Sequence, residues 1–175
     1  MTIPAQKFRE IVFQLLYSYD IGRATDENMI DLLTKELSVT KKIICDAQRH
    51  LQLILKHKDE IDATIAKTSH AYAFERIQTV ERNILRIGVY EILFDENIPP
   101  KVAIAEAMRL ARKFSTKEAA SFVNAILDAI YKRSIGKDAD TTLLEESVDN
   151  LVKIEEISHD ASQNMKIEQE NPEEN

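Results

Sequence analysis

Four basic residues cluster where one predicted helix ends and the next begins: Arg109, Arg112, Lys113 and Lys117. Within this cluster, Ser115-Thr116-Lys117-Glu118 fits the S/T-x-x-E capping box that opens many helices. Free amides at a helix N-terminus, next to hydroxyls and cations, form a ready site for phosphate. Phe114 lies beside this site and offers either a stacking surface for a nucleobase or a core contact. The cations also complement a helix dipole, so a structural role and a phosphate-binding role both stay open.

The first predicted helix, over about residues 4–21, is a second candidate surface. One face carries ordinary core residues, and the opposite face carries a second apolar stripe of Phe13, Tyr17 and Ile21, interrupted by polar positions. A surface helix needs only one such stripe, so either another helix layer or a protein partner covers the second. Lys7 and Arg9 flank the stripe, and cations beside an exposed tyrosine suit single-stranded RNA.

The central predicted helix, over residues 79–95, interleaves an aromatic with cations in the same way. Arg82, Arg86 and Tyr90 are spaced by four residues. Glu91 falls on an apolar face, which predicts a buried, hydrogen-bonded carboxylate, whereas Glu81 points elsewhere and is expected to be an exposed anchor for a partner.

Signatures of catalysis are missing from the sequence. It contains no G-x-x-x-x-G-K-[ST], G-x-G-x-x-G, H-E-x-x-H or G-x-S-x-G motif. The single cysteine, Cys45, excludes an internal disulfide and a cysteine-based zinc site, and it is expected to be a small core residue. His50 and His57 lie two helical turns apart and are expected on the surface. We therefore expect a non-enzymatic protein with no cofactor and no small-molecule substrate.

The 175-residue chain has 44% hydrophobic and 30% charged residues but only 3 glycines and 4 prolines, a composition typical of one helical domain. No apolar run approaches the roughly 18 residues that span a bilayer. The N-terminus lacks a signal-peptide pattern, so a cytoplasmic, non-membrane protein is expected.

Charge divides the chain into a body and a tail. The net charge is −7, but residues 134–175 carry 12 acids and 3 bases, which leaves 18 acids and 20 bases in residues 1–133. The polar end, residues 169–175, is expected to be disordered. Apolar residues at helical spacing predict a weak amphipathic helix over about 141–157. The tail is either a solvated appendage or an acidic segment that covers a basic surface or docks on a partner.

The remaining pattern predicts an all-α body of about seven helical pieces with short connections. Thr2 and Thr25 are the expected starts of the first two helices, and Gly22 is the expected stop of the first. The expected helices cover about residues 4–21, 25–37, 40–57, 72–76, 79–95, 101–114 and 116–131. Residues 58–60 either kink the third of these helices or continue it to about residue 66. The 79–95 helix is apolar nearly all round, which predicts a buried hub.

Several segments resemble the NusB family of transcription antitermination proteins. They are Arg9-Glu10 with Gln14-Leu15-Leu16-Tyr17, the stretch from Val80 to Ile92, Ile98-Pro99-Pro100-Lys101-Val102-Ala103, Ala111-Arg112-Lys113-Phe114 and Phe122-Val123-Asn124-Ala125. The resemblance covers both ends of residues 1–133 in the right order, while residues 23–75 match only in helical pattern. It implies two packed helical bundles.

The resemblance also implies function and partners. It implies binding of boxA RNA as a heterodimer with the ribosomal protein NusE, in antitermination complexes of RNA polymerase during ribosomal RNA synthesis. Positions that match the family's RNA surface are Gln6, Lys7, Arg9, Tyr17, Arg86, Lys113, Phe114, Lys117 and Glu118. The partner-facing residues, from this match and from the second apolar stripe, are Phe13, Tyr17, Ile21, Glu75, Arg76 and Glu81.

Two departures from the family pattern affect this expectation. The N-terminal segment Ala5-Gln6-Lys7-Phe8-Arg9 holds fewer cations than the arginine run common in the family, which predicts weaker RNA binding without the partner. The acidic tail is not part of the usual pattern. Two alternatives stay open: an RNA-guiding accessory module for a ribosomal RNA methyltransferase, and a module that binds only protein.

Overall fold

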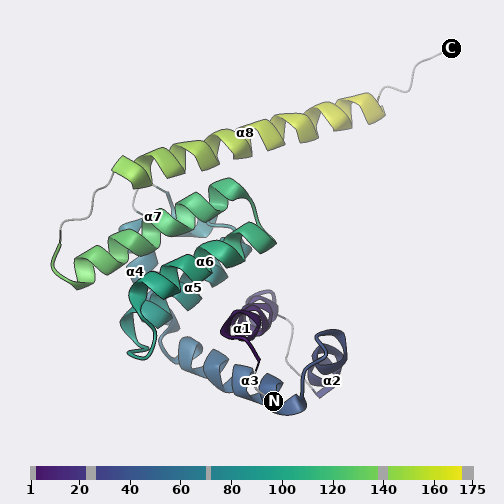
Figure 1. Ribbon diagram of the computed structural model, residues 1–175. Coiled ribbons are helices and arrows are strands. Elements are labelled where there is room, and N and C mark those ends of the chain that lie inside the picture. Colours follow the sequence, from purple (N-terminus) through teal and green to yellow (C-terminus); the bar gives the residue numbers. More distant parts are fainter. Residues whose placement is uncertain (1–2, 23–26, 70–71, 138–141, 171–175) are drawn as a thin grey trace.

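The computed structural model describes residues 3–22, 27–69, 72–137 and 142–170 (Figure 1). Every regular element in these ranges is helical, which confirms the all-α prediction. The elements are α1 (Ala5–Asp20), α2 (Glu27–Glu36), α3 (Lys41–Lys56), α4 (Lys58–Thr68), the 3₁₀ turn η1 (Phe74–Arg76), α5 (Thr79–Leu93), α6 (Pro100–Phe114), α7 (Lys117–Ser134) and α8 (Thr142–Glu170).

The helices form two bundles that share one hydrophobic core. In the first bundle α1 and α2 pack on α3, and in the second α4, α5, α6 and α7 pack together, with α8 lying along α7 (Figure 1). Helix α5 joins the bundles because it contacts α1 and α3 on one side and α4, α6 and α7 on the other. Most of the candidate site residues described below lie on α1, α5, α6 and the start of α7.

Helix α5 is the buried hub that its all-round apolar pattern predicts. Ile84, Leu85 and Val89 are fully buried, and so is the amide of Asn83. Gly88 permits close packing: a Cβ added there would lie 2.6 Å from a terminal methyl carbon of Leu127 on α7. The hub therefore depends on a glycine at the point where α5 and α7 approach each other most closely.

The helix boundaries follow the expected signals with small differences. Helix α1 ends at Asp20, and Gly22 adopts a positive φ of 76° beyond it, as expected of a stop. Of the two alternatives for the end of the third helix, a kink or a continuation, the structure shows a break at His57, whose φ and ψ are −103° and 7°, followed by α4. The expected helix starts at Thr2 and Thr25 lie outside the described residues.

The acidic tail contains a longer helix than the sequence predicts. Helix α8 runs from Thr142 to Glu170, beyond the expected 141–157, and buries Leu144 and Val148 in the core. The disorder expected for residues 169–175 falls largely on 171–175, which lie outside the described residues. A tail with buried anchor residues is a docked element, not a fully solvated appendage.

Candidate nucleic-acid and partner interface

The seam between α1 and α6 is held by ion pairs around one carboxylate. Glu10 accepts hydrogen bonds from Arg109 Nη1 at 2.6 Å and from Lys113 Nζ at 2.7 Å. Arg109 also donates to Glu106, at 3.0 Å, and to the backbone oxygen of Gln6, at 3.1 Å. Burial by itself raises the pKa of Glu10, but hydrogen bonds from the two cations outweigh it and hold that pKa below its usual range. The first helix is therefore tied to the predicted cation cluster.

Aromatic rings continue the seam at the C-terminal end of α6. The rings of Phe13 and Phe114 lie 4.7 Å apart between centroids, and the ring of Tyr17 lies 6.1 Å from that of Phe13. The Lys113 ammonium lies 5.4 Å from the centre of the Phe114 ring. Phe13 is buried, whereas Tyr17 and Phe114 remain half-buried. Phe13, which was expected to contact a partner, instead packs against Phe114 of the same chain. The rings of Tyr17 and Phe114 remain partly exposed.

The start of α7 carries a cap, but at a different residue from the one expected. Thr116 Oγ1 accepts a hydrogen bond from the backbone N–H of Ala119 at 3.1 Å, and so acts as the N-cap. The Ser115 hydroxyl instead donates to the carboxylate of Glu81 on α5. Lys117 is exposed and Glu118 half-buried at this helix start. The cap at Thr116 and the carboxylate of Glu81 are therefore linked through Ser115.

Three cations beside the seam face solvent and form the surface that we call the cation row: Arg112, Lys113 and Lys117. The side chain of Lys113 is 50% exposed even while it pairs with Glu10. Arg112 belongs to the cluster recognised in the sequence, although only the tertiary structure shows that it faces outward. Exposed cations next to half-buried aromatic rings are the combination that binds single-stranded RNA.

Gln6 and Lys7 lie at the other end of the seam. Gln6 is exposed, and its side-chain amide donates to Glu106 at 3.3 Å. The Lys7 ammonium donates to the backbone oxygen of Leu37, at 2.7 Å, and thereby ties α1 to the segment after α2. Gln6 lies on the face shared with Arg109, whereas Lys7 already has a partner within the first bundle.

Arg9 does not lie on the surface predicted for it. Its side chain is 10% exposed and its Nε donates to Glu91 at 2.8 Å. Burial raises the pKa of Glu91 despite the hydrogen bond from Arg9. Glu91 is the buried carboxylate that the sequence predicts, and Arg9 is its counter-ion. Because Glu91 holds its guanidinium inside the protein, Arg9 is not available on the surface predicted to contact RNA.

Arg86 is also inside the protein, in contrast to the predicted RNA contact. Its side chain is 3% exposed and lies between Asp62 on α4 and Asp20 at the end of α1. Nε and Nη2 donate to the two oxygens of Asp62 at 2.7 and 2.8 Å, and Nη1 lies 3.0 Å from Asp20. Arg86 joins the two bundles, because Asp20 belongs to the first bundle and Asp62 to the second.

The predicted partner-facing residues divide into exposed and buried members. Glu75 and Arg76 of η1 are exposed, and Ile21 is 42% exposed after the end of α1. Glu81, expected to be exposed, is only 6% exposed. One of its carboxylate oxygens accepts from Ser115 and the other has no hydrogen-bond partner. Glu81 is also one of the residues that line a cavity.

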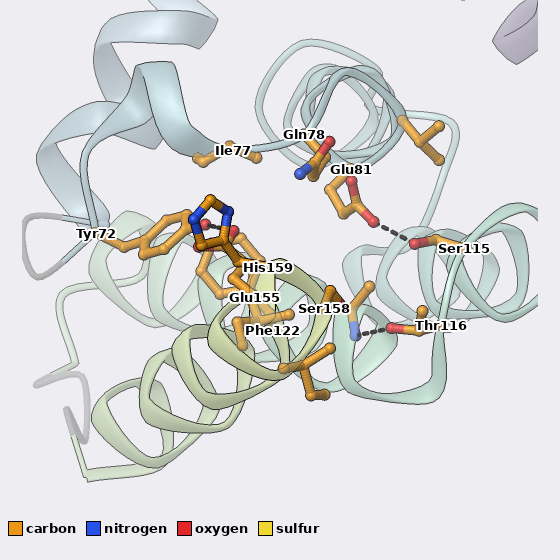
Figure 2. Close-up of a pocket in the computed structure, with 14 residues that line it drawn as sticks. Tyr72, Ile77, Gln78, Glu81, Ser115, Thr116, Phe122, Glu155, Ser158 and His159 are labelled. Carbon is orange, nitrogen blue, oxygen red and sulfur yellow. Dashed lines mark hydrogen bonds between the residues drawn. The ribbon is translucent and has the colours of Figure 1, made fainter. Parts of the chain in front are cut away.

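This cavity, of about 540 Å³, lies between the body and α8 (Figure 2). Tyr72, Ile77 and Glu81 line it from the side of η1 and α5, and Phe122 lines it from α7. Helix α8 supplies the opposite wall, including Glu155. No pattern in the sequence predicts this cavity, because its walls come from segments about 80 residues apart in the chain.

His50, His57 and Cys45 are all half-buried. His50 packs edge-on against Phe8 and Tyr90, and His57 stacks on Phe94 with a centroid distance of 4.2 Å. Both histidines are half-buried, contrary to the expected surface position, and Cys45 is half-buried instead of in the core.

Among the described residues, no group of three or more potential metal ligands gathers. In that same part of the chain, no helix is long and apolar enough to cross a membrane.

Acidification is expected to destabilise the protein through His50. Burial lowers the pKa of His50 below 6.5, because the charged imidazolium is poorly solvated there; Asp95 opposes and Arg9 adds to this effect. As the pH falls through about 6.5, His50 binds a proton in the unfolded chain before it does so in the folded protein. The contribution of His50 to the free energy of unfolding is therefore complete above that pH and is lost below it. Chemical unfolding of the chain and of His50→Gln between pH 7.5 and 5.5 measures the difference.

The variant should lose less free energy of unfolding over this interval than the unaltered chain. The difference is at most about 1.4 kcal/mol per pH unit for one proton. Glu91, whose raised pKa gives a slope of opposite sign, is present in both proteins and cancels in the comparison. Equal pH slopes would show that His50 is as well solvated in the folded state as in the unfolded one.

The comparisons with known proteins agree with this architecture. The NusB family model matches residues 6–132. The chain is 34% identical over 131 residues to the transcription antitermination protein NusB of Chlamydia pneumoniae, an alignment that covers 75% of this chain and 82% of that protein. It is 36% identical over 140 residues to NusB of Thermodesulfovibrio yellowstonii, covering 74% of this chain and 93% of the relative.

Solved structures give the same result. T. maritima NusB superposes with a TM-score of 0.64 at 31% identity, covering 83% of this chain and 99% of that one. A chain in the crystal structure of antitermination factors NusB and NusE in complex with dsRNA superposes with a TM-score of 0.62 at 29% identity, covering 73% and 96%. With a family match over residues 6–132 and a shared two-bundle helical fold, this chain belongs to the NusB family.

Proposed function

We propose that this protein is a transcription antitermination factor that binds boxA-type single-stranded RNA as a heterodimer with NusE. In this role it acts in the cytoplasm on RNA polymerase during ribosomal RNA transcription. It works without catalysis, because its function is to hold RNA and a ribosomal protein side by side. The observation that carries the proposal is family membership over nearly the whole body, together with a structural relative that assembles with NusE and RNA.

The geometry of the seam supports an RNA contact along α6 and the start of α7. The Lys113 ammonium lies 5.4 Å from the centre of the half-buried Phe114 ring, and Arg112 and Lys117 are exposed close to it along the chain. The half-buried ring of Tyr17 lies next to that of Phe13, which in turn contacts Phe114. Cations bind phosphates through counterion release, while aromatic rings stack on unpaired bases. Gln6 and Glu118 flank this surface and complete the proposed RNA site.

The proposed NusE surface comprises Tyr17, Ile21, Glu75, Arg76 and Glu81. Ser115 connects it to the RNA site, since this residue follows Phe114 in the chain and donates to Glu81. Arg9 and Arg86 are removed from the RNA site because both are engaged by buried carboxylates. The loss of these cations leaves few phosphate contacts, so the isolated protein should bind RNA weakly and depend on NusE.

Binding measurements with and without the partner test this proposal. Labelled boxA RNA and a scrambled RNA of equal length are titrated with the protein, alone and with NusE, at two salt concentrations. We expect a preference for boxA that strengthens with NusE, and an affinity that falls as salt rises. Binding of NusE without RNA would instead support a protein-only module. Lack of boxA preference together with binding to ribosomal RNA fragments would support an accessory role for a methyltransferase.

A further inference from the structure

Helix α8 is an addition to the part of the chain that the family model matches, which ends at residue 132. Its first turns are anchored on the body, because Leu144 and Val148 are buried in the same core as α7. Leu151 and Val152 are partly buried against that core. The helix is thus held at a fixed place and direction, and its following turns extend over η1 and the start of α5 (Figures 1 and 2).

One acidic residue of α8 engages the proposed partner surface directly. Glu155 accepts a hydrogen bond from the Tyr72 hydroxyl, which lies beside it in the cavity (Figure 2). It accepts another from Arg76 Nη2 at 2.8 Å. Arg76 also places its guanidinium 4.8 Å from the centre of the Tyr72 ring. Arg76 is one of the exposed residues assigned to the NusE surface, and its side chain is already paired within the chain.

The next turns of α8 roof the cavity that contains Glu81. Leu151, Ile154 and Glu155 form the wall opposite Ile77 and Glu81. The second carboxylate oxygen of Glu81 is buried without a hydrogen-bond partner. A buried carboxylate oxygen that lacks a donor is unfavourable, and a donor from a bound partner would relieve this. Helix α8 therefore covers Glu81 but donates no hydrogen bond to this oxygen.

We propose that the segment of α8 over residues 151–159 is an intramolecular occupant of the partner surface and competes with NusE for it. This inference rests on the proposed function, which assigns Arg76 and Glu81 to the NusE surface. In this proposal, a segment of NusE replaces residues 151–159 on the surface. It supplies a hydrogen-bond acceptor for Arg76, apolar side chains for the cavity and a hydrogen-bond donor for Glu81. Leu144 and Val148 anchor the start of α8 outside the shared surface, so only the later turns of the helix need to dissociate from the body.

The contacts of this segment suit reversible displacement. The side chains of Arg76 and Glu155 are 55% and 33% exposed, so water competes with their ion pair. An intramolecular competitor lowers the apparent affinity of the partner by the fraction of molecules in which the surface is open. The acidic tail thereby raises the concentration of NusE that is needed for binding, while the residues of the partner surface stay the same.

A single charge reversal in the full-length chain tests the competition. Glu155→Lys removes the acceptor for Tyr72 and Arg76 and places a cation beside Arg76. Glu156→Lys is the matched control, because the neighbouring Glu156 is exposed and the change in net charge is identical. We expect Glu155→Lys to bind NusE about tenfold more tightly than Glu156→Lys in calorimetric titrations without RNA. Equal or weaker binding by Glu155→Lys overturns the inference.

Hydrogen exchange on the unaltered chain provides a readout that needs no substitution. Backbone amides of residues 151–159 should exchange more rapidly in the NusE complex than in the free protein, because this segment is displaced. Unchanged or slower exchange there would mean that α8 stays in place, and would overturn the competition even if NusE binds. If neither the unaltered chain nor any variant binds NusE, the proposed function fails together with the inference, an outcome distinct from equal binding by all three proteins.

Discussion

Arg86→Met is expected to lower the free energy of unfolding by about 3–5 kcal/mol, because it leaves two largely buried carboxylates without their shared cation. Arg86 donates two hydrogen bonds to Asp62 and pairs with Asp20 at 3.0 Å. Methionine retains much of the side-chain volume but supplies no charge and no donor. Since Asp62 is on α4 and Asp20 ends α1, the loss also weakens the junction between the bundles. Urea unfolding followed by circular dichroism measures the change.

The pH dependence of this loss identifies its cause. Burial alone raises the pKa of Asp62 and of Asp20, but hydrogen bonds from Arg86 and neighbouring cations outweigh it, so both pKa values lie below 3.8. Stability from a depressed carboxyl pKa is present above the unfolded value and is lost as the pH falls through the folded one. The difference between the unaltered chain and Arg86→Met should therefore be largest near neutral pH and narrow below about pH 3.8.

Arg112→Met is the matched control for this substitution. Arg112 is exposed on α6, so the same chemical change there should alter the free energy of unfolding by no more than about 0.5 kcal/mol. If the two variants unfold at the same urea concentration, Arg86 is solvated in the folded protein and the assignment to the bundle junction is wrong.

Removing the cation row is expected to weaken RNA binding more than any single substitution on the surface. Alanine at Arg112, Lys113 and Lys117 together should reduce boxA affinity by about tenfold or more at physiological salt, since three phosphate contacts are lost. The slope of log affinity against log salt should become shallower by about two, because each contact on a single strand contributes roughly 0.7. Fluorescence anisotropy over a salt series, with NusE present, measures both quantities.

Three exposed lysines elsewhere provide a control of equal charge: Lys42, Lys56 and Lys67, on α3 and α4. Their replacement by alanine removes the same net charge but no proposed phosphate contact. The control should retain most of the affinity and a salt slope close to that of the unaltered chain. If both triple variants lose affinity equally, binding depends on net charge alone and the cation row is not the RNA site.

Composition and periodicity were sufficient to establish the class of the fold and the positions of most helices. Helical periodicity, few glycines and a helix that is apolar all round are local properties, and they led correctly to an all-α protein with α5 at its centre. Gly22 likewise marked the end of α1, since a positive φ favours glycine wherever the helix packs. The family resemblance followed from the same segments of sequence.

Which charged side chains a ligand can reach depends on contacts between segments that are distant in the chain. Lys113 and Arg9 are both cations next to aromatic residues in sequence, yet Lys113 is half-exposed while Arg9 neutralises Glu91 inside the protein. A charge is buried or exposed according to whether a distant segment supplies its counter-ion, and helical periodicity carries no information about that distant segment. For the same reason, the contact of Glu155 with Arg76, 79 residues away, became visible only once α8 was placed on the body.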